Sequence, residues 1–302
     1  MPPPSGCVLT PDFQDSTPLG DLPIGSFAVR GKGLRLAVTL LTVIPWRGAG
    51  DDAAPGGDTA PPRADAAAAM AWAPAVGLLL GVVASAVLLL ADHPLGAGPL
   101  TASVLAVGSL ALLTRGLHLD GLADLADGLA SGKPAPDALD IMRRPDIGAL
   151  GAVTLVLTLL LQVAALSQAE SAGHGRGPAA LIAAVVTGRL AITWACRRGV
   201  PAARPDGLGA LVAGSVRPAV AAAASAVTLA AATAAVAISA TVTVGALGWT
   251  LPLAVAAGLG VAFGLQRHAV RRLGGITGDV LGGLAEIAMT VTLVVAAMGP
   301  PA

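Results

Sequence analysis

The sequence predicts an all-α integral membrane protein, with about seven transmembrane helices behind a short N-terminal interfacial or re-entrant helix. Three observations predict this fold class. Of the 302 residues, 55% are hydrophobic and 12% are charged, about half the charge of a typical soluble domain. Seven apolar segments are each near the ~20 residues that a helix needs to cross a bilayer. Only 2% of the residues are aromatic, which favours closely packed small-residue helices over an aromatic-girdled β-barrel.

A short apolar segment, Leu34 to Trp46, precedes the predicted spans. At about a dozen residues it is too short to cross a bilayer, and its basic start suits anionic headgroups, so we expect an interfacial or re-entrant helix. Residues 1–28 are rich in Pro and Asp and lack the pattern of a signal peptide. We expect them to be a disordered extension of a single polytopic catalytic domain, residues 29–302. Residues 47–70 are expected to form a flexible loop.

The predicted spans are 71–91, 99–117, 148–168, 179–196, 218–240, 243–264 and 280–298. If all seven cross, 16 of the 18 lysines and arginines lie on one side of the membrane. Arg176 alone lies on the other side, and Arg189 lies within a span. By the positive-inside rule we expect a protein of the cell membrane with its N-terminus and its active-site loops in the cytoplasm and its C-terminus outside.

The composition also excludes some classes of function. The formal net charge is +0, so nothing indicates nucleic acid as a partner. Two cysteines, Cys7 and Cys196, are too few for a disulfide framework or a thiolate metal cluster. The expected surroundings are the lipid bilayer.

An acidic segment follows the second predicted span. Asp120, Asp124 and Asp127 lie at i, i+4 and i+7, within roughly 60° of one helix face if the helix of that span continues. Clustered carboxylates together with substrate phosphates are how proteins hold Mg²⁺. The alternative is a solvated helix end balanced by arginines, but the intervening residues are Leu, Ala and Gly, which favours a metal site. His118 lies about 160° from Asp120 on such a helix and is expected to pack or hydrogen-bond rather than bind metal.

Three loops place arginine beside glycine and aspartate on the same predicted side of the membrane: 143–151, 204–209 and 271–279. Guanidinium groups suit phosphate binding, glycines allow close backbone approach, and a helix N-terminus in the first loop would attract an anion. For any single loop the alternative is a membrane anchor with a turn. The candidate substrate-binding residues are Arg143, Gly148, Arg204, Arg272, Gly274, Gly275 and Thr277, and Asp279 is a further catalytic acid.

Two charged residues lie inside predicted spans. Arg189 follows Gly188, and Glu286 lies seven residues after Asp279 on the same face. Ionisable groups within a membrane span are functional candidates by default, so both are expected to bind substrate. The alternative is a structural ion pair between them.

Together these residues predict a site for a diphosphate–Mg²⁺ complex. The metal would neutralise the phosphates, arginines would hold their oxygens, and a carboxylate would take the proton of an attacking hydroxyl. No loop is long enough to form a separate nucleotide-hydrolysing domain. The residues therefore favour a transfer reaction in which a hydroxyl attacks a diphosphate-activated substrate and a nucleoside monophosphate leaves.

Two motifs carry a family resemblance. The run from Leu117 to Asp124, followed by Asp127-Gly128, and the run from Leu273 to Gly282, followed by Glu286, resemble the signatures of the adenosylcobinamide-GDP ribazoletransferases, or cobalamin (5′-phosphate) synthases. The resemblance covers roughly residues 33–298. Smaller matches occur in the expected order at Ile147-Gly148 with Gly151, Gly188-Arg189, and Arg204-Pro205 with Gly207 and Gly209.

Two departures from the family pattern are visible. Val43 stands where the family usually has a basic residue, in Leu-Thr-Arg-Ile-Pro. Residues 143–146 read Arg-Arg-Pro-Asp where the family often reads Lys-Asp-Ser-Arg, so two charges exchange places.

The resemblance implies a membrane enzyme that joins adenosylcobinamide-GDP to α-ribazole, or to its 5′-phosphate. The products would be adenosylcobalamin, or its 5′-phosphate, and GMP, with Mg²⁺ as cofactor. Asp120, Asp124 and Asp127 would hold Mg²⁺ on the diphosphate, and Asp279 would be a second acidic group or the base. Phosphate contacts would come from Arg143, Arg204 and Arg272.

Two other functions compete with this one. A CDP-alcohol phosphotransferase also uses aspartates spaced by three or four on a membrane helix, but its pattern has an Arg and further Asp residues that this chain lacks. A transporter would explain Arg189 and Glu286, but it would place its charges near mid-membrane and show repeat symmetry. Here the polar residues concentrate at one face.

Overall fold

The computed structural model describes residues 26–46, 62–173, 175–242 and 250–298. Within these ranges the chain forms eleven helices and, apart from two isolated β-bridges, no β-structure. The helices are α1 (Ser26–Leu41), α2 (Arg63–Asp92), α3 (Gly98–Leu113), α4 (Leu117–Ala130), α5 (Ala135–Ile141), α6 (Ala149–Ser171), α7 (Arg176–Ala195), α8 (Gly207–Val212), α9 (Pro218–Val242), α10 (Thr250–Leu273) and α11 (Gly278–Ala297).

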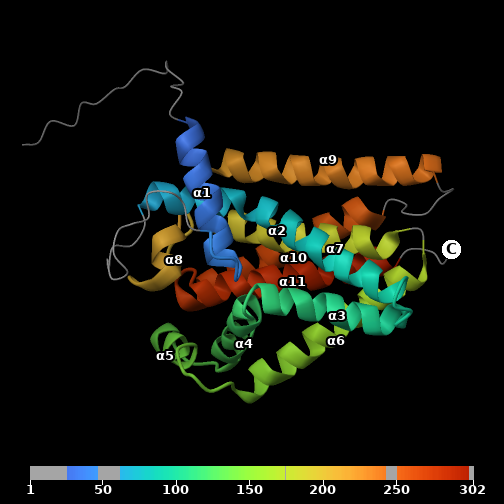
Figure 1. Ribbon diagram of the computed structural model, residues 1–302. Coiled ribbons are helices and arrows are strands. Elements are labelled where there is room, and N and C mark those ends of the chain that lie inside the picture. The colour runs from blue at the N-terminus through green and yellow to red at the C-terminus, as the bar shows by residue number, and fades with distance from the viewer. Residues whose placement is uncertain (1–25, 47–61, 174, 243–249, 299–302) are drawn as a thin grey trace, which may run out of the picture.

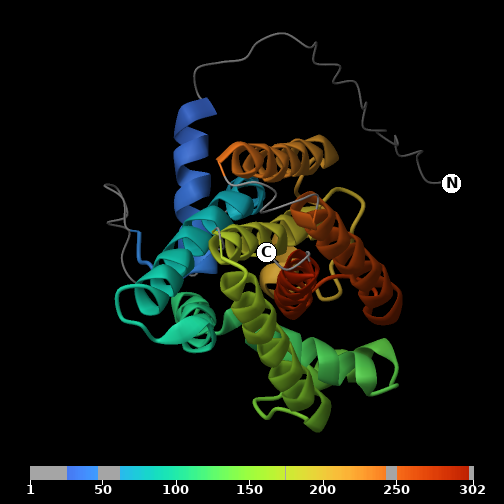
Figure 2. The same ribbon diagram turned by 90° about the vertical axis from the view of Figure 1, so that its right-hand side faces the viewer.

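The long helices form a bundle around α11, which packs against α7, α10, α4 and α6. The short helices α4, α5 and α8 lie at one end of this bundle (Figure 1). Helix α1 lies across the long helices at the same end, as an interfacial helix does, and its Gly33 packs against Ala68 of α2. Figure 2, turned by 90°, shows α11 inside the ring of helices.

The chain is a multi-pass membrane protein. Five helices, α2, α6, α7, α10 and α11, are long and apolar enough to cross a membrane. Helix α3 is long enough only if it is counted together with α4 as one bent span. Each of the seven predicted spans contains a helix. Helix α9 is 25 residues long, but the part whose side chains are described, Pro218–Ala234, is by itself too short to be counted as a span. The structure therefore supports five or six spans in the described residues, and the predicted number of seven is approximate.

The acidic segment is not a continuation of the second span. Helix α3 ends at Leu113, and the axis of α4 is bent by 87° from that of α3. Between them Arg115 and Gly116 have φ angles of 54° and 67°. This left-handed backbone cannot continue a right-handed helix, so the chain turns sharply. The three aspartates share one helix as predicted, but that helix is the separate α4.

Two other boundaries differ from the prediction. Helix α2 begins at Arg63, so residues 63–70, predicted as loop, are helical; their alanines are strong helix formers. Helix α1 begins at Ser26, within the predicted extension 1–28. Residues 1–25 and 47–61 lie outside the described residues.

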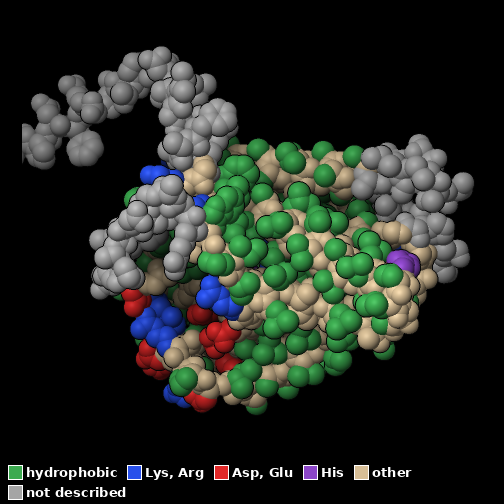
Figure 3. All heavy atoms as spheres, viewed as in Figure 1, with side chains coloured by type: hydrophobic (Ala, Val, Ile, Leu, Met, Phe, Trp, Pro, Cys, Tyr) green, Lys and Arg blue, Asp and Glu red, His purple; other side chains and the backbone are tan. Residues whose placement is uncertain are grey.

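Charged side chains gather at one end of the molecule, and apolar side chains cover much of the rest of the visible face (Figure 3). Large apolar residues are exposed along α3 and α6, among them Leu112 at 78% and Leu160 at 60%. Such surfaces face lipid in a membrane protein. The site therefore lies where the bundle meets water.

Candidate active site

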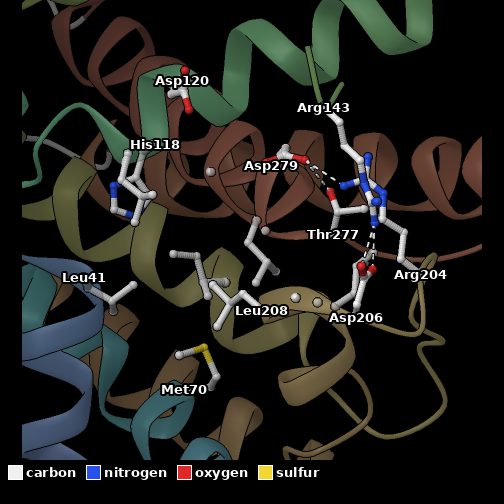
Figure 4. Close-up of a pocket in the computed structure, with 18 residues that line it drawn as sticks. Leu41, Met70, His118, Asp120, Arg143, Arg204, Asp206, Leu208, Thr277 and Asp279 are labelled. Atoms are coloured by element: carbon white, nitrogen blue, oxygen red, sulfur yellow. Dashed lines mark hydrogen bonds and ion pairs between the residues drawn. The ribbon is translucent and has the colours of Figure 1, made fainter. Parts of the chain in front are cut away.

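A cavity of about 400 Å³ opens at the charged end of the bundle. Its walls come from segments far apart in sequence: α1, α2, α4, the turn after α5 that contains Arg143, the loop before α8, and the start of α11. Figure 4 shows its two kinds of wall, with Arg143, Arg204 and Asp279 on one side and Leu41 and Met70 on the other. The cavity can thus hold a molecule with a charged part and an apolar part.

Glycines let α4 cross α11 at backbone contact. A Cβ on Gly121 would lie 2.9 Å from the Cα and the carbonyl oxygen of Asp279, and one on Gly282 would lie 3.1 Å from the Cα of His118. Either methyl group would push the two helices apart. This crossing brings Asp120 of α4 and Asp279 of α11, two acids predicted to act in the site, into the wall of one cavity.

Asp124 lies beside these two acids. The pKa of Asp124 is raised to about 7, chiefly by burial and then by the charges of Asp120, Asp279 and Asp127, while Arg204 opposes the rise. Carboxylates that raise one another's pKa are stabilised by a bound cation. Asp120 and Asp279 line the cavity and Asp124 lies behind them, and among the described residues the oxygens of these three acids do not all lie within 4.8 Å of one another.

Asp127 has a different environment from the other two acids of its stripe. Its Oδ2 accepts a hydrogen bond from the N–H of Gly148 at 2.8 Å, and its Oδ1 accepts one from the N–H of Gly151 at 2.8 Å. A side chain at either glycine would overlap the carboxylate. The sequence predicted that this helix N-terminus attracts an anion, and the anion in the structure is Asp127 itself. Neither Asp127 nor Gly148 lines the cavity.

Two of the three predicted phosphate-binding arginines line the cavity. Arg204 donates from Nη2 to the carbonyl of Leu139, and its Nη1 lies 3.9 Å from Oδ2 of Asp279. The buried Nε of Arg204 has no hydrogen-bond partner among the described residues. Arg143 donates from Nη2 to both carboxylate oxygens of Asp206, at 2.8 and 2.9 Å (Figure 4).

The third arginine, Arg272, is not among the cavity-lining residues. It donates to the carbonyl of Lys133 at 3.3 Å. Gly274, with a φ angle of 84°, and Gly275, which packs against the backbone of residues 201–203, shape the loop before α11 instead of facing the cavity.

Thr277 does line the cavity, and it caps α11. Its Oγ1 accepts a hydrogen bond from the N–H of Val280 at 3.2 Å and donates one to Oδ2 of Asp279 at 3.2 Å. This cap fixes the first turn of α11 and so orients Asp279.

Arg189 and Glu286 lie deeper between the helices, outside the cavity that holds the other candidates. Both are buried, and together with Gln162 they line a separate space of about 10 Å³. Nε2 of Gln162 donates to Oε2 of Glu286 at 2.9 Å. Their position away from the cavity does not support direct contact with substrate, and among the described residues the predicted ion pair between Arg189 and Glu286 is not formed within 4.0 Å.

Comparisons of the sequence with known proteins identify one family. A family model described as cobalamin-5-phosphate synthase matches residues 33–297, which include every candidate site residue. The chain belongs to the cobalamin-5-phosphate synthase family. It is 47% identical over 278 residues to an adenosylcobinamide-GDP ribazoletransferase of Frankia casuarinae, covering 88% of this chain and 95% of the relative.

Two further relatives carry the same name. The protein of a Nocardioides species is 36% identical, with 86% of this chain and 95% of the relative covered. The protein of Desulforamulus reducens is 33% identical, with 88% and 96% covered. No solved structure matches the chain. None of the relatives named here is a CDP-alcohol phosphotransferase or a transporter.

His118 lines the cavity, although sequence reasoning did not assign it to the site. Its side chain lines the cavity but is only 2% exposed, and neither ring nitrogen has a hydrogen-bond partner among the described residues. Burial, and then the charge of Arg189, hold its pKa well below the usual value, so the imidazole is neutral. The signal in the sequence was its place two residues before Asp120; its position on a different helix face led us to expect packing.

Proposed function

We propose that this chain is a membrane-bound adenosylcobinamide-GDP ribazoletransferase. It joins adenosylcobinamide-GDP to α-ribazole, or to its 5′-phosphate, and releases GMP in the nucleotide-loop assembly of cobalamin. Family membership and the names of the relatives support the reaction. The observation that carries the proposal is the cavity itself, in which acids of α4 and α11 face two arginines beside an apolar wall.

The arginines bind the diphosphate of the donor. Arg204 is held by the carbonyl of Leu139 and Arg143 by Asp206, so both guanidinium groups are fixed in place before substrate arrives. A preorganised guanidinium binds phosphate oxygens without first paying the entropy of ordering its side chain. The unpartnered Nε of Arg204 provides a further donor.

Mg²⁺ is the proposed cofactor. Asp120, Asp124 and Asp279 would hold it, which requires their oxygens to move closer together than they lie in this structure; the mutual repulsion that raises the pKa of Asp124 supports a cation nearby. When bound, Mg²⁺ would neutralise charge on the diphosphate and stabilise the charge that develops during transfer. Asp127, assigned to the metal from the sequence, would position α4 against α6 through its bonds to Gly148 and Gly151.

The reaction is a single displacement at phosphorus. The 5′-hydroxyl oxygen of α-ribazole forms a bond to the phosphorus on the cobinamide side, and the bond from that phosphorus to the bridging oxygen breaks, so GMP leaves with the bridging oxygen. The hydroxyl proton passes to a carboxylate, for which Asp279 is our candidate because it lies in the cavity wall; it would use the oxygen that does not contact the metal. His118 would hydrogen-bond the acceptor beside the apolar wall.

We also propose that the cavity opens to the cytoplasm of the cell and that the C-terminus lies outside. Arg143 and Arg204 line the cavity, charged side chains gather at one end of the molecule (Figure 3), and cytoplasmic segments of membrane proteins are rich in arginine and lysine.

The test is an assay of the purified chain in detergent with adenosylcobinamide-GDP, α-ribazole and Mg²⁺, read by mass spectrometry. Adenosylcobalamin and GMP should appear together and should disappear when a chelator is added. Absence of both products from folded protein, with either form of the acceptor, would overturn the proposal. Product that persists after chelation would remove Mg²⁺ from it.

A further inference from the structure

A second group of potential metal ligands lies at the other end of the bundle. Asp92 is the last residue of α2, His93 follows it, and Glu170 lies in the last turn of α6. Gln168, close to Glu170, donates to the carbonyl of Ala297 at the end of α11, whereas the catalytic cavity lies at the start of α11. The group is therefore separated from the cavity by the length of α11.

The ligand atoms of this group converge. One oxygen or nitrogen atom from each of Asp92, His93 and Glu170 lies within 4.8 Å of the other two. Nε2 of His93 is 3.7 Å from Oε1 of Glu170, and its Nδ1 is 4.0 Å from Oδ2 of Asp92. Ligands of a tetrahedral Zn²⁺ ion at about 2.0–2.1 Å would lie roughly 3.3 Å apart. Only one nitrogen of His93 can bind the ion, so the imidazole would have to turn and the three ligand atoms would have to move inward from their 4.8 Å limit.

The charges around this group favour a bound cation. Asp92 and Glu170 both belong to helix C-termini, where the helix dipole adds negative charge, although the carboxylate of Glu170 also lies against Gly177 in the first turn of α7, whose dipole end is positive. Among the described residues, His93 is the only basic group within 4.0 Å of either carboxylate.

Glu170 provides an independent observation. Its side chain is only 6% exposed, and the basic group that faces its carboxylate is the imidazole of His93, 3.7 Å away. Gly177 makes room for this carboxylate, because a Cβ at that position would overlap Oε2 of Glu170. A buried carboxylate is costly without a partner. The side chain of His93 is 67% exposed, which gives an ion a path from solution.

We propose that Asp92, His93 and Glu170 form a binding site for a divalent transition-metal ion, with Zn²⁺ as the ion that fits best. One imidazole and two carboxylates are a ligand set for Zn²⁺, whereas Mg²⁺ and Ca²⁺ are held by oxygen ligands alone. Water would complete the coordination. The ion would join the ends of α2 and α6, so its effect is on stability and not on catalysis.

The test compares variants of the full chain, purified in detergent and stripped with a chelator. Zn²⁺ is added with Mg²⁺ in constant excess, and both the bound zinc and the melting temperature are measured. Co²⁺ is used in parallel because its visible spectrum reports tetrahedral coordination. The variants are His93→Ala and Glu170→Gln, and the matched control is His268→Ala, which removes an exposed histidine of α10.

The parent and His268→Ala should bind one more Zn²⁺ per chain than His93→Ala or Glu170→Gln, and only the first two should melt at a higher temperature with zinc. Equal zinc binding in all four proteins would overturn the proposal. The proposal would also be overturned if zinc did not change the melting temperature and the melting temperature fell as the pH was raised through the range where histidine loses its proton. That result would indicate a charged imidazole between two carboxylates. None of these outcomes depends on the proposed transferase activity.

Discussion

The catalytic cavity and the buried polar group around Arg189 and Glu286 use the same kinds of side chain in opposite ways. In the cavity, Asp120, Asp279 and Arg204 line a space that is open to a ligand. In the buried group, Glu286 accepts a hydrogen bond from Gln162, and little free space remains. The comparison teaches that charge inside a membrane span does not identify a substrate site; an open cavity beside the charge does.

The largest expected effect falls on the buried group. Arg189→Met should destabilise the fold by about 3–5 kcal/mol, because it leaves Glu286 buried near an apolar side chain of similar length. Melting temperature and the yield of monodisperse protein measure this loss. A double variant, Arg189→Met with Glu286→Gln, should recover part of it. Normal stability with lost activity in Arg189→Met would contradict the comparison and return Arg189 to the substrate site.

At the proposed metal site beside the cavity the expected effect is on rate. Asp124→Asn should lower GMP release by more than about 100-fold, since it removes a proposed metal ligand. Its melting temperature should not fall, because the substitution relieves repulsion from Asp120 and Asp279. The control is Asp137→Asn, which alters an exposed acid of α5 and should leave the rate unchanged. Full activity in Asp124→Asn would exclude it from the metal site.

A smaller effect on rate is expected from a matched pair of substitutions in two of the three arginine loops. Arg204→Ala should slow the reaction by about 30-fold, which corresponds to one charge-assisted hydrogen bond of about 2 kcal/mol. Arg272→Ala should stay within about threefold of the parent, because its partner is the carbonyl of Lys133 and it does not line the cavity. Steady-state kinetics with the donor varied measure both. Equal losses would show that the cavity extends to Arg272.

The smallest effect concerns the helix crossing that builds the cavity. Gly121→Ala should cost about 1–2 kcal/mol of stability, because the added methyl group meets the backbone of Asp279. Gly108→Ala on α3 is the control, since nothing lies within 4 Å of a Cβ there, and it should be neutral or slightly stabilising. Thermal unfolding compares them. Equal stability of the two variants would mean that α4 and α11 do not touch at Gly121.

Local features of the sequence predicted much of this molecule. Hydropathy and length act within a segment, so each predicted span contains a helix, and the i, i+4, i+7 spacing placed the three aspartates on one helix. The break before α4 escaped prediction because it depends on Arg115, a residue type that seldom adopts a left-handed backbone.

Contacts between distant segments could not be read from the sequence. Asp127 bonds to Gly148 and Gly151 across more than twenty residues, and only the fold reveals that its carboxylate caps α6. Arg204 and Arg272 have the same local pattern of Arg, Gly and Asp, yet only Arg204 reaches the cavity. The sequence names the candidates, and tertiary packing selects among them.

Substrate protection of the cavity tests the central claim most directly. In a Cys7→Ser background, where Cys196 is buried, Leu208→Cys places a thiol in the cavity wall and Leu95→Cys places one on the exposed far end. The rate of alkylation is measured with and without adenosylcobinamide-GDP and Mg²⁺. We predict that the donor slows the labelling of Leu208→Cys and leaves that of Leu95→Cys unchanged. Unchanged labelling of Leu208→Cys at a donor concentration that saturates turnover would show that the substrate binds elsewhere.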